Sequence, residues 1–176
     1  MDLPYELRDQ LQQAYSAERA AAYAYQGYAG SLPARDREDK LRISEIENDE
    51  WIHRAEVHEL MQLYGVPVSM YYEAKYWLIG KTISISCYVI GWFMPMYFAG
   101  RLESGNVNEY YRMIDLFHTE GITRHDDALE EMGIKEKEHE VFFLSKIRAH
   151  AWLPFFEKVF GWGASRSYNP IDLDEL

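Results

Sequence analysis

The sequence predicts an all-α protein, an up-down-down-up four-helix bundle with a crossover helix and a short C-terminal helix. Apolar residues recur at alternating steps of three and four along four segments, which is the period of a helix with one buried face. Glycine and proline lie between these segments, where helices are expected to end. A glutamate interrupts each apolar stripe near its middle, and in two stripes a histidine follows it after three residues.

Length and composition set the broad class. The 176 residues suit one domain, and we expect residues 1–160 to form the bundle and residues 161–176 a C-terminal loop and tail. A hydrophobic content of 48% excludes a disordered protein, and a net charge of −11 leaves no basic face for a nucleic-acid partner. Cys87 is the single cysteine, which excludes an internal disulfide and predicts a buried, inert thiol in its apolar run. The first residues show no secretory signal, so a cytoplasmic location is expected.

The first helix is expected to begin at Asp2 and Pro4, since proline is tolerated in a first helical turn, and to end before Pro33. Its inner face places Glu18 in the middle of an apolar stripe, where a lone charge would be costly. Residues 31–34 are expected to form a short turn. The stripe consists of Leu7, Leu11, Ala14, Glu18, Ala21, Tyr25 and Tyr28.

The second helix is expected over residues 36–64, because Gly65 and Pro67 stop it. Glu50 and His53 lie one helical turn apart, so both side chains share the inner face. That face consists of Ile43, Ile46, Glu50, His53, Val57, Leu60 and Tyr64.

Residues 68–117 are expected to form either two helices or one long kinked helix. The stretch 76–100 carries one formal charge, Lys81, and is long enough to cross a membrane. Small residues and Pro95 interrupt it, so a buried crossover helix ranks first, a surface that docks on a membrane second and a transmembrane span third. Pro95 is expected to open or kink the next helix. The inner face of that helix consists of Met96, Ala99, Glu103, Asn106, Tyr110, Met113 and Phe117.

A break at residues 119–124 precedes the fourth helix, which Thr123 is expected to cap. Gly133 within this helix costs about 1 kcal/mol relative to alanine. The inner face consists of His125, Leu129, Met132, Glu136, His139, Phe143 and Lys146 or Ile147. Residues 152–160 are expected to form a short apolar helix that closes one end of the bundle. The tail after it ends in the acidic residues Asp172, Asp174 and Glu175.

The sequence uses one design twice, a glutamate on one helix and Glu-x-x-His on the next. Glu50 follows Glu18 by 32 residues, and Glu136 follows Glu103 by 33. One Glu-x-x-His alone would more often be a surface hydrogen bond, but two matched copies inside apolar stripes favour a metal site. Four carboxylates and two imidazoles need compensation in an apolar core, and two divalent cations supply it. The expected ligands are Glu18, Glu50, His53, Glu103, Glu136 and His139.

Mixed carboxylate and imidazole ligands with open positions favour iron or manganese over metals that prefer thiolates, and zinc is a possible substitute in vitro. Tyr25 and Tyr110 lie two helical turns beyond Glu18 and Glu103. They are candidates for a catalytic role, in which they line a pocket or take part in redox chemistry. The alternative is that they are aromatic residues of the core. Small residues beside the ligands leave room either for a substrate cavity or for close helix packing: Ala14, Ala21, Ala22, Ala99 and Gly100. The remaining histidines, expected at the surface or beside the ligands, are His58, His118, His125 and His150.

Over about residues 5–150 the chain resembles the ferritin-like di-iron carboxylate superfamily. Segments 17–23 and 50–53 are similar to rubrerythrin and to demethoxyubiquinone hydroxylase, whereas segment 101–111 is more similar to the hydroxylase. The resemblance implies a ferritin-like bundle in which the six ligands hold two iron ions that reduce O₂. It also implies that the apolar run before residue 101 contacts membrane and quinone. The chain departs from rubrerythrin in lacking paired cysteines and in carrying Asn106 where a further glutamate ligand would lie.

The expected function is that of a di-iron oxidoreductase, a monooxygenase or hydroxylase that uses O₂ to hydroxylate or oxidise an organic substrate. The partners expected are a small apolar, quinone-like substrate, an external electron donor, a second copy of the chain, and a membrane surface contacted peripherally through residues 76–100. The alternative is a rubrerythrin- or ferritin-like iron-binding protein for peroxide detoxification or iron handling. A third alternative is a structural metal bundle that acts through partners.

Overall fold

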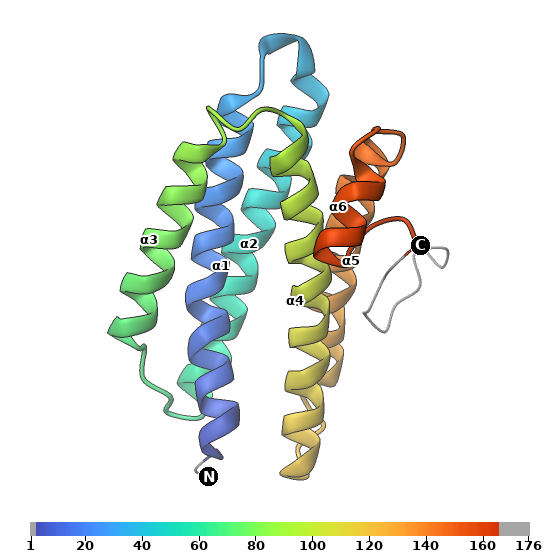
Figure 1. Cartoon of the computed structure of the whole chain (residues 1–176). Coiled ribbons are helices and arrows are strands. Elements are labelled where there is room, and N and C mark those ends of the chain that lie inside the picture. The colour runs from blue at the N-terminus through green and yellow to red at the C-terminus, as the bar shows by residue number, and fades with distance from the viewer. Residues whose placement is uncertain (1–2, 166–176) are drawn as a thin grey trace. The chain divides into compact units, whose positions relative to one another are not determined.

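The computed structural model describes residues 3–165, which contain six α-helices and no β-strand (Figure 1). The all-α prediction is therefore confirmed for this part of the chain. The chain divides into two compact units at the junction of Trp92 and Phe93. Two expectations fall outside the described residues: the helix start at Asp2, and the acidic tail with Asp172, Asp174 and Glu175.

The first unit is built on a hairpin of α1 (Tyr5–Ser31) and α2 (Arg37–Leu63). The two helices run antiparallel, since the Tyr15 ring contacts His58 and the Tyr23 ring contacts Trp51. A 3₁₀ turn, η1 (Ala34–Asp36), joins them close to the expected turn. Both expected stripes are buried except at Tyr64, the final residue of the second stripe.

The third helix, α3 (Met70–Ser86), runs parallel to α1 (Figure 1). Their backbones approach so closely that a Cβ on Gly80 would lie 2.7 Å from the Ala20 Cα, and one on Gly27 would lie 2.4 Å from the Ser84 Cα. Gly80 is the one buried residue of α3. The helix α3 therefore contacts α1 along a narrow strip around Gly80 and exposes its large apolar side chains. The first-ranked expectation, a buried crossover helix, was wrong.

None of the helices in the described residues is long and apolar enough to cross a membrane. The stretch 76–100 is not one helix, since α3 ends at Ser86 and the next helix begins at Phe93. Between them Gly91 has a φ of 79°, a left-handed conformation that favours glycine. Pro95 is the third residue of the new helix and opens it as expected, because the backbone N–H that proline lacks would have no acceptor within the helix at that position.

The second unit is a hairpin of α4 (Phe93–Thr119) and α5 (Asp126–Ile147), followed by α6 (Leu153–Phe160). The expected inner faces of α4 and α5 are buried, apart from half-buried Asn106 and exposed Lys146, so that Ile147 completes the stripe. Thr123 does not cap α5. His125 takes the N-cap position, and the Thr123 carbonyl accepts a turn hydrogen bond from the Asp126 amide.

The segment that follows α6 is tied to α4 and α5 through Trp162. The Tyr97 hydroxyl donates to the Trp162 carbonyl at 2.7 Å, and the Trp162 indole donates to Glu140 Oε1 at 2.7 Å. Glu140 Oε2 in turn pairs with the buried ammonium of Lys137 at 3.1 Å. The indole lies against Gly100, where a Cβ would be 2.3 Å from the ring. Close packing therefore accounts for Gly100, rather than a substrate cavity.

Candidate metal centre

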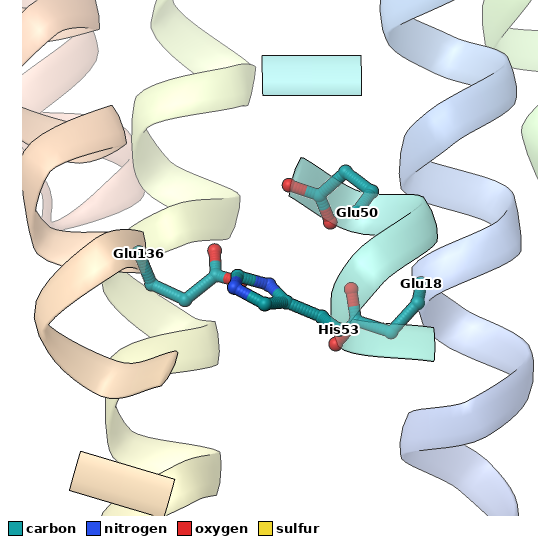
Figure 2. Close-up of side chains that lie close together, drawn as sticks. All are labelled: Glu18, Glu50, His53 and Glu136. Carbon is teal, nitrogen blue, oxygen red and sulfur yellow. The ribbon is translucent and has the colours of Figure 1, made fainter. Parts of the chain in front are cut away.

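The first unit buries one group of three expected ligands, the first triad: Glu18 of α1 with Glu50 and His53 of α2 (Figure 2). Their side chains are between 0 and 4% exposed. Each offers one ligand atom, and these atoms lie within 4.8 Å of one another. The antiparallel pairing of α1 and α2 brings Glu18 to the Glu-x-x-His turn, whose two side chains share a helix face. The sequence prediction for these three residues agrees with their placement.

The second unit buries the equivalent group, the second triad: Glu103 of α4 with Glu136 and His139 of α5. All three are fully buried, and their ligand atoms also lie within 4.8 Å of one another. His139 Nδ1 lies 3.9 Å from Glu136 Oε2. The hairpin therefore repeats the chemistry of the first unit, with one carboxylate from the first helix and a carboxylate and imidazole from the second.

Asn106 holds the two carboxylates of the second triad. Its amide nitrogen donates to Glu103 Oε2 and to Glu136 Oε2, at 3.2 Å in each case. The sequence places Asn106 in the apolar stripe of α4, at a position where a further glutamate ligand is absent, and does not predict these hydrogen bonds. Its position one turn after Glu103 was the available signal, because residues three apart on a helix share a face.

The donor set of each triad fits a divalent cation. Two adjacent carboxylates and a neutral imidazole place two negative charges in a site closed to water, which is unfavourable without compensation. One divalent ion per triad would neutralise these charges, and carboxylate oxygens with imidazole nitrogens suit iron, manganese or zinc. The buried carboxylate and histidine groups can thus bind metal, while their chemistry leaves open which metal it is.

Tyr25 on α1 and Tyr110 on α4 are both almost fully buried. Each lies seven residues beyond the glutamate of its triad, on the same face of the helix. The Gly133 backbone approaches Tyr110, since a Cβ on that glycine would lie 3.7 Å from the Tyr110 Cβ. This packing agrees with core aromatics, and a redox or pocket-lining role remains a prediction.

The other histidines differ in their surroundings. His118 is exposed and lies 2.8 Å from Asp126. The half-buried His58 lies at a tilt against the Tyr15 ring, and the half-buried His150 stacks on the Phe93 ring. His125 is buried, so the expectation of a surface position does not hold for it. Burial lowers the pKa of the His125 imidazole, Arg124 lowers it further and Asp126 opposes the shift.

Cys87 is buried after the end of α3, as expected. Burial raises the pKa of its thiol to about 11, so the reactive thiolate form is scarce at neutral pH. The prediction of an inert cysteine is consistent with this environment.

Comparison with protein-family models, with curated proteins and with solved structures gives no match to this chain.

Proposed function

We propose that each triad holds one divalent metal ion and that the two ions form a di-metal centre in a ferritin-like bundle. The observation that carries the proposal is the repeated burial of two carboxylates and one imidazole within ligand distance in two hairpins of the same design. Four carboxylates balance the charge of two divalent ions. One glutamate from each of two helices and Glu-x-x-His from each of two others is also the ligand set of ferritin-like di-metal proteins.

Iron is the metal we propose first, followed by manganese, because both accept mixed oxygen and nitrogen ligands with open positions. Bound iron would supply the electron transfer that reduces O₂. The residues of the chain then hold the metals and exclude water, and Asn106 orients Glu103 and Glu136 through its amide.

The reaction we propose is hydroxylation or oxidation of a small apolar, quinone-like molecule. In a hydroxylation one oxygen atom of O₂ enters the substrate and the other leaves as water. This stoichiometry consumes two electrons and two protons, so an external electron donor is part of the proposal. The support for this reaction class is the resemblance of segments 17–23, 50–53 and 101–111 to di-iron hydroxylases.

Anaerobic loading with Fe(II) followed by O₂ tests the proposal. The wild-type chain is expected to bind two iron ions, to develop transient visible absorption on mixing with O₂ and to consume electrons only when a donor is present. E50A and E136A are each expected to lose binding of two ions, while E45A and E130A, which change exposed glutamates on the same helices, keep it.

Other outcomes would replace the proposed function. Uptake of many iron ions per chain into a large assembly would identify iron storage, and peroxide consumption without oxidation of an organic molecule would identify detoxification. Full helicity that is lost on chelation, without any reaction with O₂, would identify a structural metal site.

We also propose that α3 contacts a lipid surface peripherally. The face of α3 and the turn after it exposes large apolar side chains, among them Tyr71, Trp77, Leu78, Ile83, Ile85 and Val89. Lys75 and Lys81 are cations, and the single acid of α3, Glu73, is paired with arginines. In a chain with a net charge of −11 this helix is suited to an anionic bilayer.

Co-flotation with vesicles of phosphatidylcholine and phosphatidylglycerol tests the lipid contact. The wild-type chain is expected to float with the vesicles, and L78E is expected to abolish flotation. L41E places the same charge at an exposed leucine of α2 and should float normally. A dimer that persists in the wild type, is lost in L78E and does not bind vesicles would show that a second copy covers α3 instead.

A further inference from the structure

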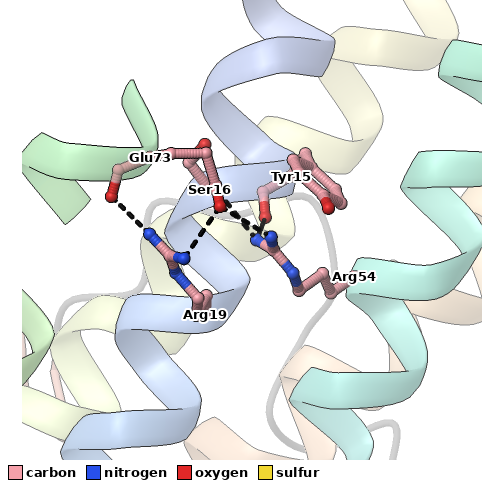
Figure 3. A network of polar contacts seen from close by, with 5 residues as sticks. All are labelled: Tyr15, Ser16, Arg19, Arg54 and Glu73. Carbon is pink, nitrogen blue, oxygen red and sulfur yellow. Dashed lines mark hydrogen bonds and ion pairs between the residues drawn. The ribbon is translucent and has the colours of Figure 1, made fainter. Parts of the chain in front are cut away.

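The residue directly after Glu18 and the residue directly after His53 are both arginines, and both reach the same carboxylate (Figure 3). Arg19 Nη1 lies 2.8 Å from Glu73 Oε2. Arg54 binds Glu73 through two nitrogens, with Nη2 at 3.0 Å from Oε2 and Nη1 at 3.2 Å from Oε1. Glu73 belongs to the first turn of α3, so one side chain joins α3 to both ligand-bearing helices of the first unit.

Further contacts fix the same group. Ser16 Oγ donates to Glu73 Oε1 at 2.9 Å, and Arg19 also donates to the Glu73 carbonyl. Arg54 donates to the Tyr15 carbonyl, and its guanidinium lies 3.6 Å from the centroid of the Tyr15 ring. The side chains of Arg19, Glu73 and Arg54 are 19, 13 and 12% exposed. Water therefore screens the cluster only in part, and its geometry is more restrictive than that of a surface ion pair.

The position of the two arginines in the sequence makes the cluster relevant to the triad. A helical residue projects about 100° around the axis from its neighbour, so fixing one side chain fixes the direction of the next. Arg19 therefore limits rotation of α1 at Glu18, and Arg54 limits rotation of α2 at His53. Because both end on Glu73, the rotation of one helix is tied to that of the other.

The second triad is supported differently. Ser104 and Glu140 follow its ligands Glu103 and His139, and Glu140 pairs with Lys137 and accepts from the Trp162 indole. A network anchored on α3 is thus a feature of the first triad. Loss of its central carboxylate should affect one metal position more than the other.

We propose that Glu73 is a positioning residue, which sets the relative orientation of Glu18 and His53 for binding a divalent metal ion. The inference rests on the proposed metal site and adds α3 to its supporting structure. Groups that orient metal ligands typically contribute 10- to 100-fold to metal affinity. Replacing Glu73 by glutamine keeps its shape and removes the charge that brings the two arginines together.

Titration of the metal-free chain with Co²⁺ tests this inference, with visible absorption as the readout of ligand geometry. E73Q is expected to weaken one of two Co²⁺ sites by about 10-fold or more and to change its spectrum, and E73D to recover part of the affinity. E45Q removes the acid of the exposed Arg42–Glu45 pair on α2 and should leave both sites unchanged.

A lower melting temperature with unchanged affinity and spectrum at both sites in E73Q would overturn the inference and leave the metal site standing. Failure of the wild-type chain to bind two ions would instead contradict the proposed function. If E73Q does not fold, R19K replaces it, because lysine keeps the charge and loses the two-nitrogen geometry. Wild-type affinity at both sites in R19K would then overturn the inference.

Discussion

At the scale of single residues, the polar side chains in the centre of the helices carry the functional information. Glu50 and Glu136 are fully buried in apolar faces, and each lies one turn before a buried histidine. The sequence predicted that all six candidate ligands of the two triads are buried, because a charged residue in an apolar stripe stands out in the helical period. It did not predict the contact of Asn106 with Glu136 or the contacts of Glu73 with the two arginines, since these partners come from other helices.

His125 provides a pH prediction at this scale. Its folded-state pKa lies below the ordinary value of 6.5, so the unfolded chain binds more protons between these two values. The contribution of His125 to the free energy of unfolding should therefore rise with pH up to about 6.5 and then stay level. Urea unfolding at several pH values should show a weaker dependence for H125F than for the wild type.

The control for this prediction is H118Q, which changes an exposed histidine. H118Q removes the contact with Asp126 and should retain the pH dependence that burial of His125 produces. Equal slopes in the wild type and H125F between pH 5 and 6.5 would contradict the assignment.

At the scale of helices, the stripes predicted where α1, α2, α4 and α5 lie, and the exposure of α3 was not predictable from them. An apolar run does not reveal whether protein, lipid or a second chain covers it, so a buried helix was the wrong expectation for α3. The sequence favours Thr123 as the N-cap of α5, because threonine is a preferred residue type at that position. The helix begins three residues after Thr123, so His125 takes the N-cap position instead.

Two glycines of α4 give a matched test of helix packing. G100A would place a methyl group 2.3 Å from the Trp162 ring, and we expect a loss of about 1–3 kcal/mol in the free energy of unfolding. G105A meets no atom within 4 Å and should gain about 0.5–1 kcal/mol, because alanine favours a helix. Chemical denaturation measures both, and equal stability of the two variants would contradict the described packing.

At the scale of the whole molecule, the acidic balance of the chain links metal binding to stability. Four of the carboxylates behind the net charge of −11 belong to the two triads, where they would repel one another without a cation. The duplicated design was visible in the sequence from the offsets of 32 and 33 residues. The division into two units at Trp92 could not be predicted from the sequence, since the apolar run continues through that junction.

Metal removal should therefore lower the stability of the whole chain. A ligand at 100 times its dissociation constant stabilises the folded state by about 2.7 kcal/mol, so chelation should lower the melting temperature by several degrees. Scanning calorimetry with and without a chelator measures the shift. The double variant E50A/E136A should show no shift, and a shift of wild-type size in it would place the stabilising metal elsewhere.

A crystal structure of the Fe(II)-loaded chain, with an anomalous-scattering map at the iron edge, tests the proposed metal site most directly. The proposed metal site predicts two peaks per chain, one contacted by Glu18, Glu50 or His53 and the other by Glu103, Glu136 or His139. Full iron loading with no peak at either triad would contradict it.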